Sequence, residues 1–257
     1  MKKQITGLNH LTKHTEQERA LTTELGKLFE TSYLSLTQRL RDFSRHTRRQ
    51  DLSRFLAKYE LFKISLPVNG SVIECGVYAG GGVMSWMHFS SILKPYNHSR
   101  RVIGFDTFAG FPAIHEKDRS GSSEHLYTGG FQTGAKIKRE LERFIQIHDR
   151  NRPLGHIPKV ELVAGDARQT IPLYVEKHPY LIISLLYLDF DLYEPTKVAL
   201  ANLYPRVCKG GVVVFDELNC PEFPGETTAL LDTFDLACIR LQRFPFDPYI
   251  SYFVKES

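Results

Sequence analysis

Long apolar runs are absent from this sequence of 257 residues, and cysteine is scarce. No run approaches the roughly 20 apolar residues of a membrane-spanning helix, and the N-terminal segment MKKQITGLNHLTKHTEQERA lacks the apolar centre of a signal peptide. The four cysteines show no CxxC spacing and no neighbouring histidine pattern. We therefore expect a cytoplasmic protein with reduced thiols, no membrane partner and no zinc site.

The sequence also lacks a large excess of charge of one sign, because 33 basic residues and 29 acidic residues leave a net charge of only +4. Most of the excess lies in a cluster formed by Arg39, Arg41, Arg45, Arg48 and Arg49. An anionic ligand or a nucleic acid would suit such a cluster, but neither interleaved aromatic residues nor a nucleic-acid-binding motif accompanies it. We expect the solvated face of a helix and no nucleic-acid partner.

What the sequence does contain is a change of periodicity near residue 67. Before this point apolar residues recur mostly at spacings of three and four, which predicts an amphipathic helix over 16–49, broken once, and a second helix over 51–63. Together they form a predicted N-terminal helical cap, residues 1–66. Such a cap would cover an active site, build a dimer interface or do both, and the sequence does not choose between these roles.

Beyond residue 67, predicted strands alternate with predicted helices. The expected strands are 71–75, 101–106, 160–164, 181–191 and 211–215, with helices at 80–93, 134–148, 167–177, 195–204 and 227–237 and a closing antiparallel pair at 239–244 and 249–254. This alternation is typical of an α/β fold with a doubly wound, mostly parallel sheet. We predict a Rossmann-like domain with seven strands over residues 67–257.

Two of the predicted strands end in pairs of carboxylates. The apolar run LIISLLYLDFD, residues 181–191, ends with Asp189 and Asp191, and the run GVVVF is followed by Asp216 and Glu217. Such runs are typical of strands buried on both faces, and ligands bind at the carboxyl edge of open α/β sheets. Four acidic groups at that edge therefore indicate a ligand site.

The turn after the first predicted strand reads ECGVYAGGG, residues 74–82, and its glycines indicate a tight turn close to a ligand. A helix that begins at the last three glycines presents free N–H groups, which predicts a nucleotide-like ligand. Tyr78 stands where the GxGxxG dinucleotide fingerprint needs its second glycine. S-adenosylmethionine carries no phosphate, and it suits a looser turn preceded by an acidic residue such as Glu74.

Two further aspartates follow predicted strands. Asp106 is placed to accept hydrogen bonds from both hydroxyls of a ribose. Asp166 is placed to meet the exocyclic amine of an adenine, with Ala167 packed on the ring. Either aspartate would alternatively serve as a helix N-cap.

Three segments and the helical cap resemble the macrocin O-methyltransferase family, which methylates sugar hydroxyls of antibiotics and other glycosides. The segments are VIECGVYAGGGVMSW, GFDTFAGFP and LDFDLYEPTKVALANLYPRVCKGGVVVFDE. The resemblance implies a class I methyltransferase fold in which S-adenosylmethionine is held by Glu74, Gly76, Tyr78 and Asp106. The full set of predicted cofactor contacts is Glu74, Gly76, Val77, Tyr78, Gly80, Asp106, Thr107, Asp166, Ala167 and Asp189.

The same resemblance implies a magnesium site. The family pattern is an LDxD segment followed by a pair of aspartates, and it assigns the ion to Asp189, Asp216 and the second member of the pair, which is Glu217 here. This departure leaves the third ligand open. Magnesium prefers oxygen ligands and acidifies a bound hydroxyl, which suits a sugar hydroxyl that is too weak an acid to attack a methyl sulfonium readily.

Asp191 is the predicted general base, because it would face the same side as Asp189 if the strand persists. A helix cap before Pro195 or a surface ion pair is its alternative role. His115 or His125 is the alternative base, although a histidine in a loop is more often a solvent-exposed residue.

Two loops, residues 107–134 and 222–226, are expected to shape the substrate pocket. We predict magnesium-dependent O-methylation of a sugar hydroxyl of a glycosylated natural product, by a homo-oligomer that takes a small-molecule glycoside. The alternatives are metal-dependent methylation of a catechol or other phenol, and a Rossmann-like binding module without catalysis. Several like charges at one edge argue against a non-catalytic shell.

Overall fold

The computed structural model describes residues 16–256, so the start of the predicted cap and the expectation about a signal peptide lie outside the described residues. The chain divides into two compact units, residues 1–54 and 55–257. The predicted boundary between residues 66 and 67 falls inside the second unit, and the domain assignment stays a prediction. Among the described residues, no helix combines the length and the apolar character needed to cross a bilayer.

The described part of the first unit is helical. It contains α1 (Glu16–Glu30), α2 (Leu36–Arg41), the 3-10 helix η1 (Phe43–Arg45) and the start of α3 (Arg49–Ser65). The helix predicted over 16–49 is therefore interrupted more than once. Ser35 fixes the beginning of α2 through a capping box, since its hydroxyl accepts the Gln38 N–H and the Gln38 side chain accepts the Ser35 N–H.

The basic cluster of this unit divides between solvent and internal partners. Arg48 forms a two-pronged ion pair with Asp51, and Arg39 donates to the carbonyl oxygen of Phe29. The other three arginines of the cluster are exposed: Arg41, Arg45 and Arg49. The cluster is therefore a solvated helical surface on which two of the arginines bind partners within the same unit.

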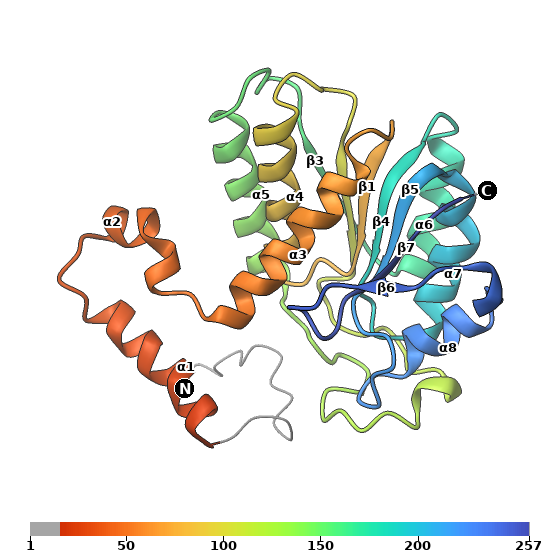
Figure 1. Ribbon diagram of the computed structural model, residues 1–257, viewed down its shortest axis with the longest axis horizontal. Helices are drawn as coiled ribbons and strands as arrows, with labels where there is room; N and C mark the ends of the chain where they lie inside the picture. Colours follow the sequence, from red (N-terminus) through yellow and green to blue (C-terminus); the bar gives the residue numbers. More distant parts are fainter. Residues whose placement is uncertain (1–15, 257) are drawn as a thin grey trace. The chain divides into compact units, whose positions relative to one another are not determined.

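The second unit is built on one seven-stranded sheet with the order β3-β2-β1-β4-β5-β7-β6 (Figure 1). Its parallel strands are β1 (Ser71–Cys75), β2 (Val102–Asp106), β3 (Val160–Ala164), β4 (Ile183–Leu188) and β5 (Val207–Phe215). An antiparallel pair, β6 (Gln242–Arg243) and β7 (Ser251–Val254), closes one edge. The predicted class, a doubly wound and mostly parallel α/β sheet of seven strands, is confirmed.

Helices cover both faces of this sheet, because successive residues of a strand point to opposite sides (Figure 1). Val72 packs with α4 (Gly81–Leu93), α5 (Ala135–Asp149) and the C-terminal part of α3. Its neighbour Ile73 packs with the second layer, which contains α6 (Ala167–Lys177), α7 (Tyr193–Leu203) and α8 (Gly225–Leu231). Trp86, the single tryptophan of the chain, is fully buried in the first layer. All four cysteines are free, as the sequence predicts.

Two element boundaries differ from the prediction in ways that affect the site. The strand predicted over 181–191 ends at Leu188, so Asp189 and Asp191 lie in the turn beyond β4. Alternation along a strand therefore does not determine where the Asp191 side chain points. The helix predicted over 227–237 begins earlier and ends earlier, which places Glu226 in the first turn of α8.

Candidate active site

Backbone hydrogen bonds continue beyond the ends of the central strands. The Asp189 N–H donates to the carbonyl oxygen of Cys75 at 2.7 Å, and the Asp216 N–H donates to that of Leu188 at 2.9 Å. The segments after β1, β4 and β5 are therefore fixed to one another by main-chain contacts. These contacts fix the edge of the sheet at which the predicted site residues lie.

Gly76 allows the first turn to approach the end of β4. Its φ is +96°, and a Cβ at this position would lie 1.8 Å from the carbonyl oxygen of Asp189. Both the conformation and the close contact require glycine. Tyr78 also has a positive φ, 51°, which is strained for a bulky residue, and Gly80 begins α4 in the left-handed conformation. Strained backbone conformations of this kind are common at functional sites.

Asp106 organises the same turn. Its Oδ2 accepts the N–H groups of Val77 and Tyr78, both at 2.8 Å, and its Oδ1 accepts the Phe108 N–H at 2.5 Å. Burial raises the pKa of Asp106, and these three N–H groups oppose the rise. The carboxylate thus holds the glycine-rich turn against the end of β2. The ribose contact predicted for Asp106 stays a prediction.

The other predicted adenosine contacts have local partners. Asp166 caps α6 by accepting the Arg168 N–H at 3.0 Å, and the Arg168 guanidinium holds the pKa of Asp166 below its ordinary value. Ala167 is buried at the start of that helix, and the Thr107 hydroxyl donates to the carbonyl oxygen of Gly110. The structure therefore shows the N-cap role that the sequence left open for Asp166. An adenine contact would be additional to it.

Glu74 lies beneath the turn rather than at its surface. The residue is 1% exposed, and the Lys58 Nζ of α3 lies 3.7 Å from its Oε1. A Cβ at Gly82 would lie 1.7 Å from the same oxygen, so α4 begins directly against this carboxylate. Burial raises the pKa of Glu74; Lys58 opposes this rise and the charge of Asp189 adds to it. The cofactor contact predicted for Glu74 stays a prediction.

Lys58 was not among the predicted site residues. Its Nζ lies 4.5 Å from the ring centroid of Tyr187 and 5.8 Å from that of Trp86. The Tyr187 hydroxyl in turn donates to Oδ1 of Asp216. The one sequence signal for Lys58 is its place within an apolar helical stripe of Phe55, Tyr59 and Phe62, where a charge needs a partner.

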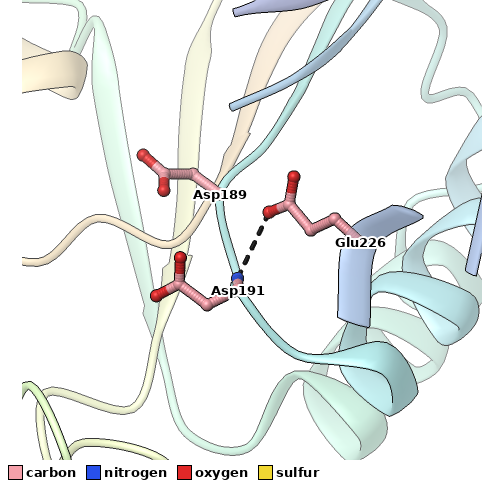
Figure 2. Close-up of side chains that lie close together, drawn as sticks. All are labelled: Asp189, Asp191 and Glu226. Carbon is pink, nitrogen blue, oxygen red and sulfur yellow. Dashed lines mark hydrogen bonds between the residues drawn. The ribbon is translucent and has the colours of Figure 1, made fainter. Parts of the chain in front are cut away.

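Asp189, Asp191 and Glu226 are the group of acidic side chains close enough to share a metal ion in the part of the chain that the structure describes (Figure 2). One ligand oxygen from each lies within 4.8 Å of the others. The two aspartates come from the turn after β4, whereas Glu226 comes from α8. Sequence spacing linked the aspartates, but nothing local in the sequence linked Glu226 to them.

The remaining predicted metal ligands, Asp216 and Glu217, are not members of this group. Both are buried, at 1% and 2% exposure. Asp216 accepts the Tyr187 hydroxyl, and the Glu217 N–H donates to Oε2 of Glu226 at 3.3 Å. The assignment of magnesium to Asp189, Asp216 and Glu217 therefore stays a prediction.

The two predicted pocket loops pack against each other. Phe111 of the first loop and Phe223 of the second are buried in one small apolar cluster, and the Phe131 ring contacts both. His125 lies with its ring 4.7 Å from that of Phe131. His115 accepts a backbone N–H at the start of a short 3-10 helix. Neither histidine is assigned as the base by these contacts.

The strand order and the glycine-rich turn after β1 are those of the Rossmann-like fold of class I methyltransferases. The family model for macrocin-O-methyltransferase (TylF) matches residues 49–229, and the chain belongs to this family. The resemblance seen in the sequence is thereby confirmed. All the predicted cofactor, catalytic and metal residues lie within the matched range.

Similar proteins act in the methylation of natural products. The chain is 29% identical over 161 residues to mycinamicin III 3''-O-methyltransferase of Micromonospora griseorubida, covering 60% of this chain and 57% of that protein. It is 28% identical over 172 residues to demethyldecarbamoylnovobiocin O-methyltransferase of Streptomyces niveus, covering 66% and 61%. The match thus spans less than two thirds of each relative. The structure of the calicheamicin methyltransferase CalS11 aligns with a TM-score of 0.91 and 32% identity over 97% of both chains.

Proposed function

We propose that this chain is an S-adenosylmethionine-dependent O-methyltransferase that acts on a sugar hydroxyl of a glycosylated natural product. The observation that carries the proposal is the likeness to CalS11 along 97% of both chains. The likeness includes the sheet edge at which Asp189 and Asp191 lie. A binding module without catalysis would have no need for these converging charges.

The names of similar proteins support a sugar as the acceptor. A relative from Streptomyces olivaceus is named as a 4'-O-methyltransferase of a rhamnosyl-tetracenomycin, with 28% identity over 155 residues. A second CalS11 structure, with 29% identity and a TM-score of 0.82 over 94% of this chain and 95% of that chain, is titled as a TDP-rhamnose 3'-O-methyltransferase. We therefore expect a deoxyhexose hydroxyl, carried either by a finished glycoside or by a nucleotide sugar.

S-adenosylmethionine would lie at the carboxyl edge, over the turn from Gly76 to Gly80. Asp106 maintains the shape of this turn through its three backbone hydrogen bonds. The sulfonium charge of the cofactor would be offset by the acidic residues of the edge, Asp189 first among them. Negative charges that line one edge attract a positively charged ligand and favour its binding.

The acidic residues of this edge suit magnesium, which binds carboxylate oxygens. Asp189 belongs both to the predicted ligand set and to the acidic group with Asp191 and Glu226. We propose Asp189 as the central ligand, with Asp216 and Glu217 as the partners that family resemblance implies. When bound, the ion would supply Lewis-acid activation of the acceptor hydroxyl.

Asp191 is proposed as the general base. It is 8% exposed and lies beside Asp189 in the turn beyond β4 (Figure 2). Its carboxylate would accept the proton of the sugar hydroxyl while the oxygen attacks the methyl carbon. The sulfur–carbon bond would break in the same step, with S-adenosylhomocysteine as the leaving group. Positioning of the two reactants supplies much of the rate in such a transfer.

Transfer of a labelled methyl group from S-adenosylmethionine tests the proposal. The acceptor panel contains rhamnosyl glycosides, rhamnose nucleotides and catechols, each assayed with magnesium and with a chelator. We expect transfer to a rhamnose hydroxyl that requires magnesium and is lost in Asp189→Ala. Absence of calorimetric binding of S-adenosylhomocysteine would overturn the whole proposal. Full activity in the presence of the chelator would overturn only the requirement for magnesium.

A further inference from the structure

Glu226 joins the two strand-end turns of the site through its side chain. The residue is 0% exposed and lies in the first turn of α8. Its Oε1 accepts the N–H groups of Phe190 at 3.0 Å and of Asp191 at 3.2 Å, and its Oε2 accepts the Glu217 N–H at 3.3 Å. One carboxylate thus satisfies three main-chain donors from segments that follow two different strands.

These donors belong to a strained part of the chain. Asp191 has a φ of 61°, in the left-handed region that non-glycine residues rarely adopt. A conformation of this kind persists only when surrounding contacts enforce it. The N–H groups of Phe190 and Asp191 converge on one oxygen of Glu226, and these contacts enforce the turn. Figure 2 shows the contact from Asp191.

We propose that Glu226 is a positioning residue of the methyl-transfer reaction: its carboxylate fixes the Phe190–Asp191 turn and ties it to the backbone of Glu217. The inference rests on the proposed function, in which Asp191 receives the proton. It assigns to α8 the task of aligning the residues after β4 with those after β5. Glu226 acts through the backbone of these residues.

The hydrogen bonds favour this role over metal ligation. A carboxylate offers about four lone-pair sites, and three of them face N–H groups here. Its Oε1 accepts two of these donors, so a cation would compete with the contacts that hold the turn. Glutamine has nearly the same shape, and its amide oxygen can retain both contacts made by Oε1.

The test compares Glu226→Gln and Glu226→Ala with the unchanged protein, and uses Glu176→Gln, an exposed position on α6, as the matched control. Amide hydrogen exchange is measured at residues 190, 191 and 217 and at the β4 residues 185–188. Methyl transfer is measured in parallel as kcat and KM, and Mn²⁺ binding is measured calorimetrically with the metal alone.

We expect Glu226→Ala to lose exchange protection at residues 190, 191 and 217 while β4 keeps it, and to lower kcat about 100-fold with little change in the KM for S-adenosylmethionine. Glu226→Gln should keep protection at 190 and 191 and recover most of kcat. Unchanged protection at these amides in Glu226→Ala would overturn the inference. A Glu226→Gln variant that keeps its protection but loses Mn²⁺ binding tenfold or more would also overturn it, in favour of a ligand role.

The exchange measurement needs no acceptor, so it separates this inference from the proposed function. If no sugar is methylated but the three amides lose protection, the proposed function fails while Glu226 still fixes the turn. In that case the kinetic part of the inference fails with the function. Circular dichroism identifies a variant that has lost its fold. If Glu226→Ala is unfolded, the Glu226→Gln variant tests the inference instead: exchange protection at residue 217 should fall, because one side-chain oxygen has been replaced by an NH2 group.

Discussion

Asp106 and Glu226 both fix backbone segments by accepting main-chain hydrogen bonds. Each is a carboxylate that accepts three main-chain N–H groups from turns at the carboxyl edge. Burial raises the pKa of both residues, and the N–H groups that they accept oppose the rise. At the residue scale, the candidate site is therefore shaped by buried acids that bind backbone, whereas the proposed chemical roles belong to Asp189 and Asp191.

Replacement of Asp191 by asparagine tests its role as the base. Asparagine keeps the size of the side chain and the backbone N–H that Glu226 accepts, but it cannot take up a proton. We expect kcat to fall by about 10²–10⁴-fold, with unchanged calorimetric binding of S-adenosylhomocysteine. The same assay on His115→Asn and His125→Asn supplies the comparison, and an Asp191→Asn enzyme with full activity would transfer the assignment elsewhere.

At the element scale, loops at the amino ends of the strands are held by buried cations. Lys159, just before β3, donates its Nζ to the carbonyl oxygens of Asn97 at 2.6 Å and Arg100 at 2.9 Å. Arg100 donates to the last carbonyl groups of α3 and to Val68, where a positive charge suits the end of a helix. These contacts lie at the edge opposite to the candidate site.

Lys159 should make stability depend on pH. Burial lowers its pKa to about 8 from an ordinary value of 10.5, and Arg152 and Arg100 contribute. Between these values the unfolded chain holds more protons than the folded chain, so the unfolding free energy rises as the pH rises. Relative to Lys159→Met, the unchanged protein should gain about 1 kcal/mol between pH 7 and pH 9 in urea denaturation.

Lys177→Met, at an exposed position on α6, is the control for this measurement. It should follow the unchanged protein across the same pH range, because the Lys177 side chain is exposed to solvent. Parallel curves for Lys159→Met and the unchanged protein would show that the proton on Lys159 does not influence folding.

Much of the sheet could be predicted because its signals are local. The run from Ser71 to Cys75 contains Val72 and Ile73 and is bounded by Gly70 and Gly76, and the structure gives the same strand limits. Lys58 and Glu226 could not be predicted as site residues, because no local signal in the sequence links them to their partners. Lys58 pairs with Glu74 of β1, and Glu226 binds the turn after β4, which lies far from it in the sequence; only the folded chain brings these partners together.

At the scale of the whole molecule, the sheet and all the predicted site residues lie in the unit of residues 55–257. A fragment of residues 55–257 should therefore fold alone, with a cooperative calorimetric transition and binding of S-adenosylhomocysteine. The fragment 49–257 keeps all of α3 and serves as the comparison. An unfolded 49–257 fragment would show that residues before the helix are required.

Sedimentation of the same fragments tests the predicted homo-oligomer. If the N-terminal helices build the subunit interface, the full chain should sediment as an oligomer and the fragment 55–257 as a monomer. Equal association states of the two would place the interface on the sheet unit.

Trp86 gives the molecule an optical property of its own. It is the chain's single tryptophan, it is fully buried, and its ring lies near the Lys58 ammonium and 5.5 Å from the ring of Tyr187. Intrinsic fluorescence excited at the red edge of protein absorption therefore comes from one known position, behind the glycine turn and beside the buried Glu74. Its emission reports directly on water entry at that position, without any label.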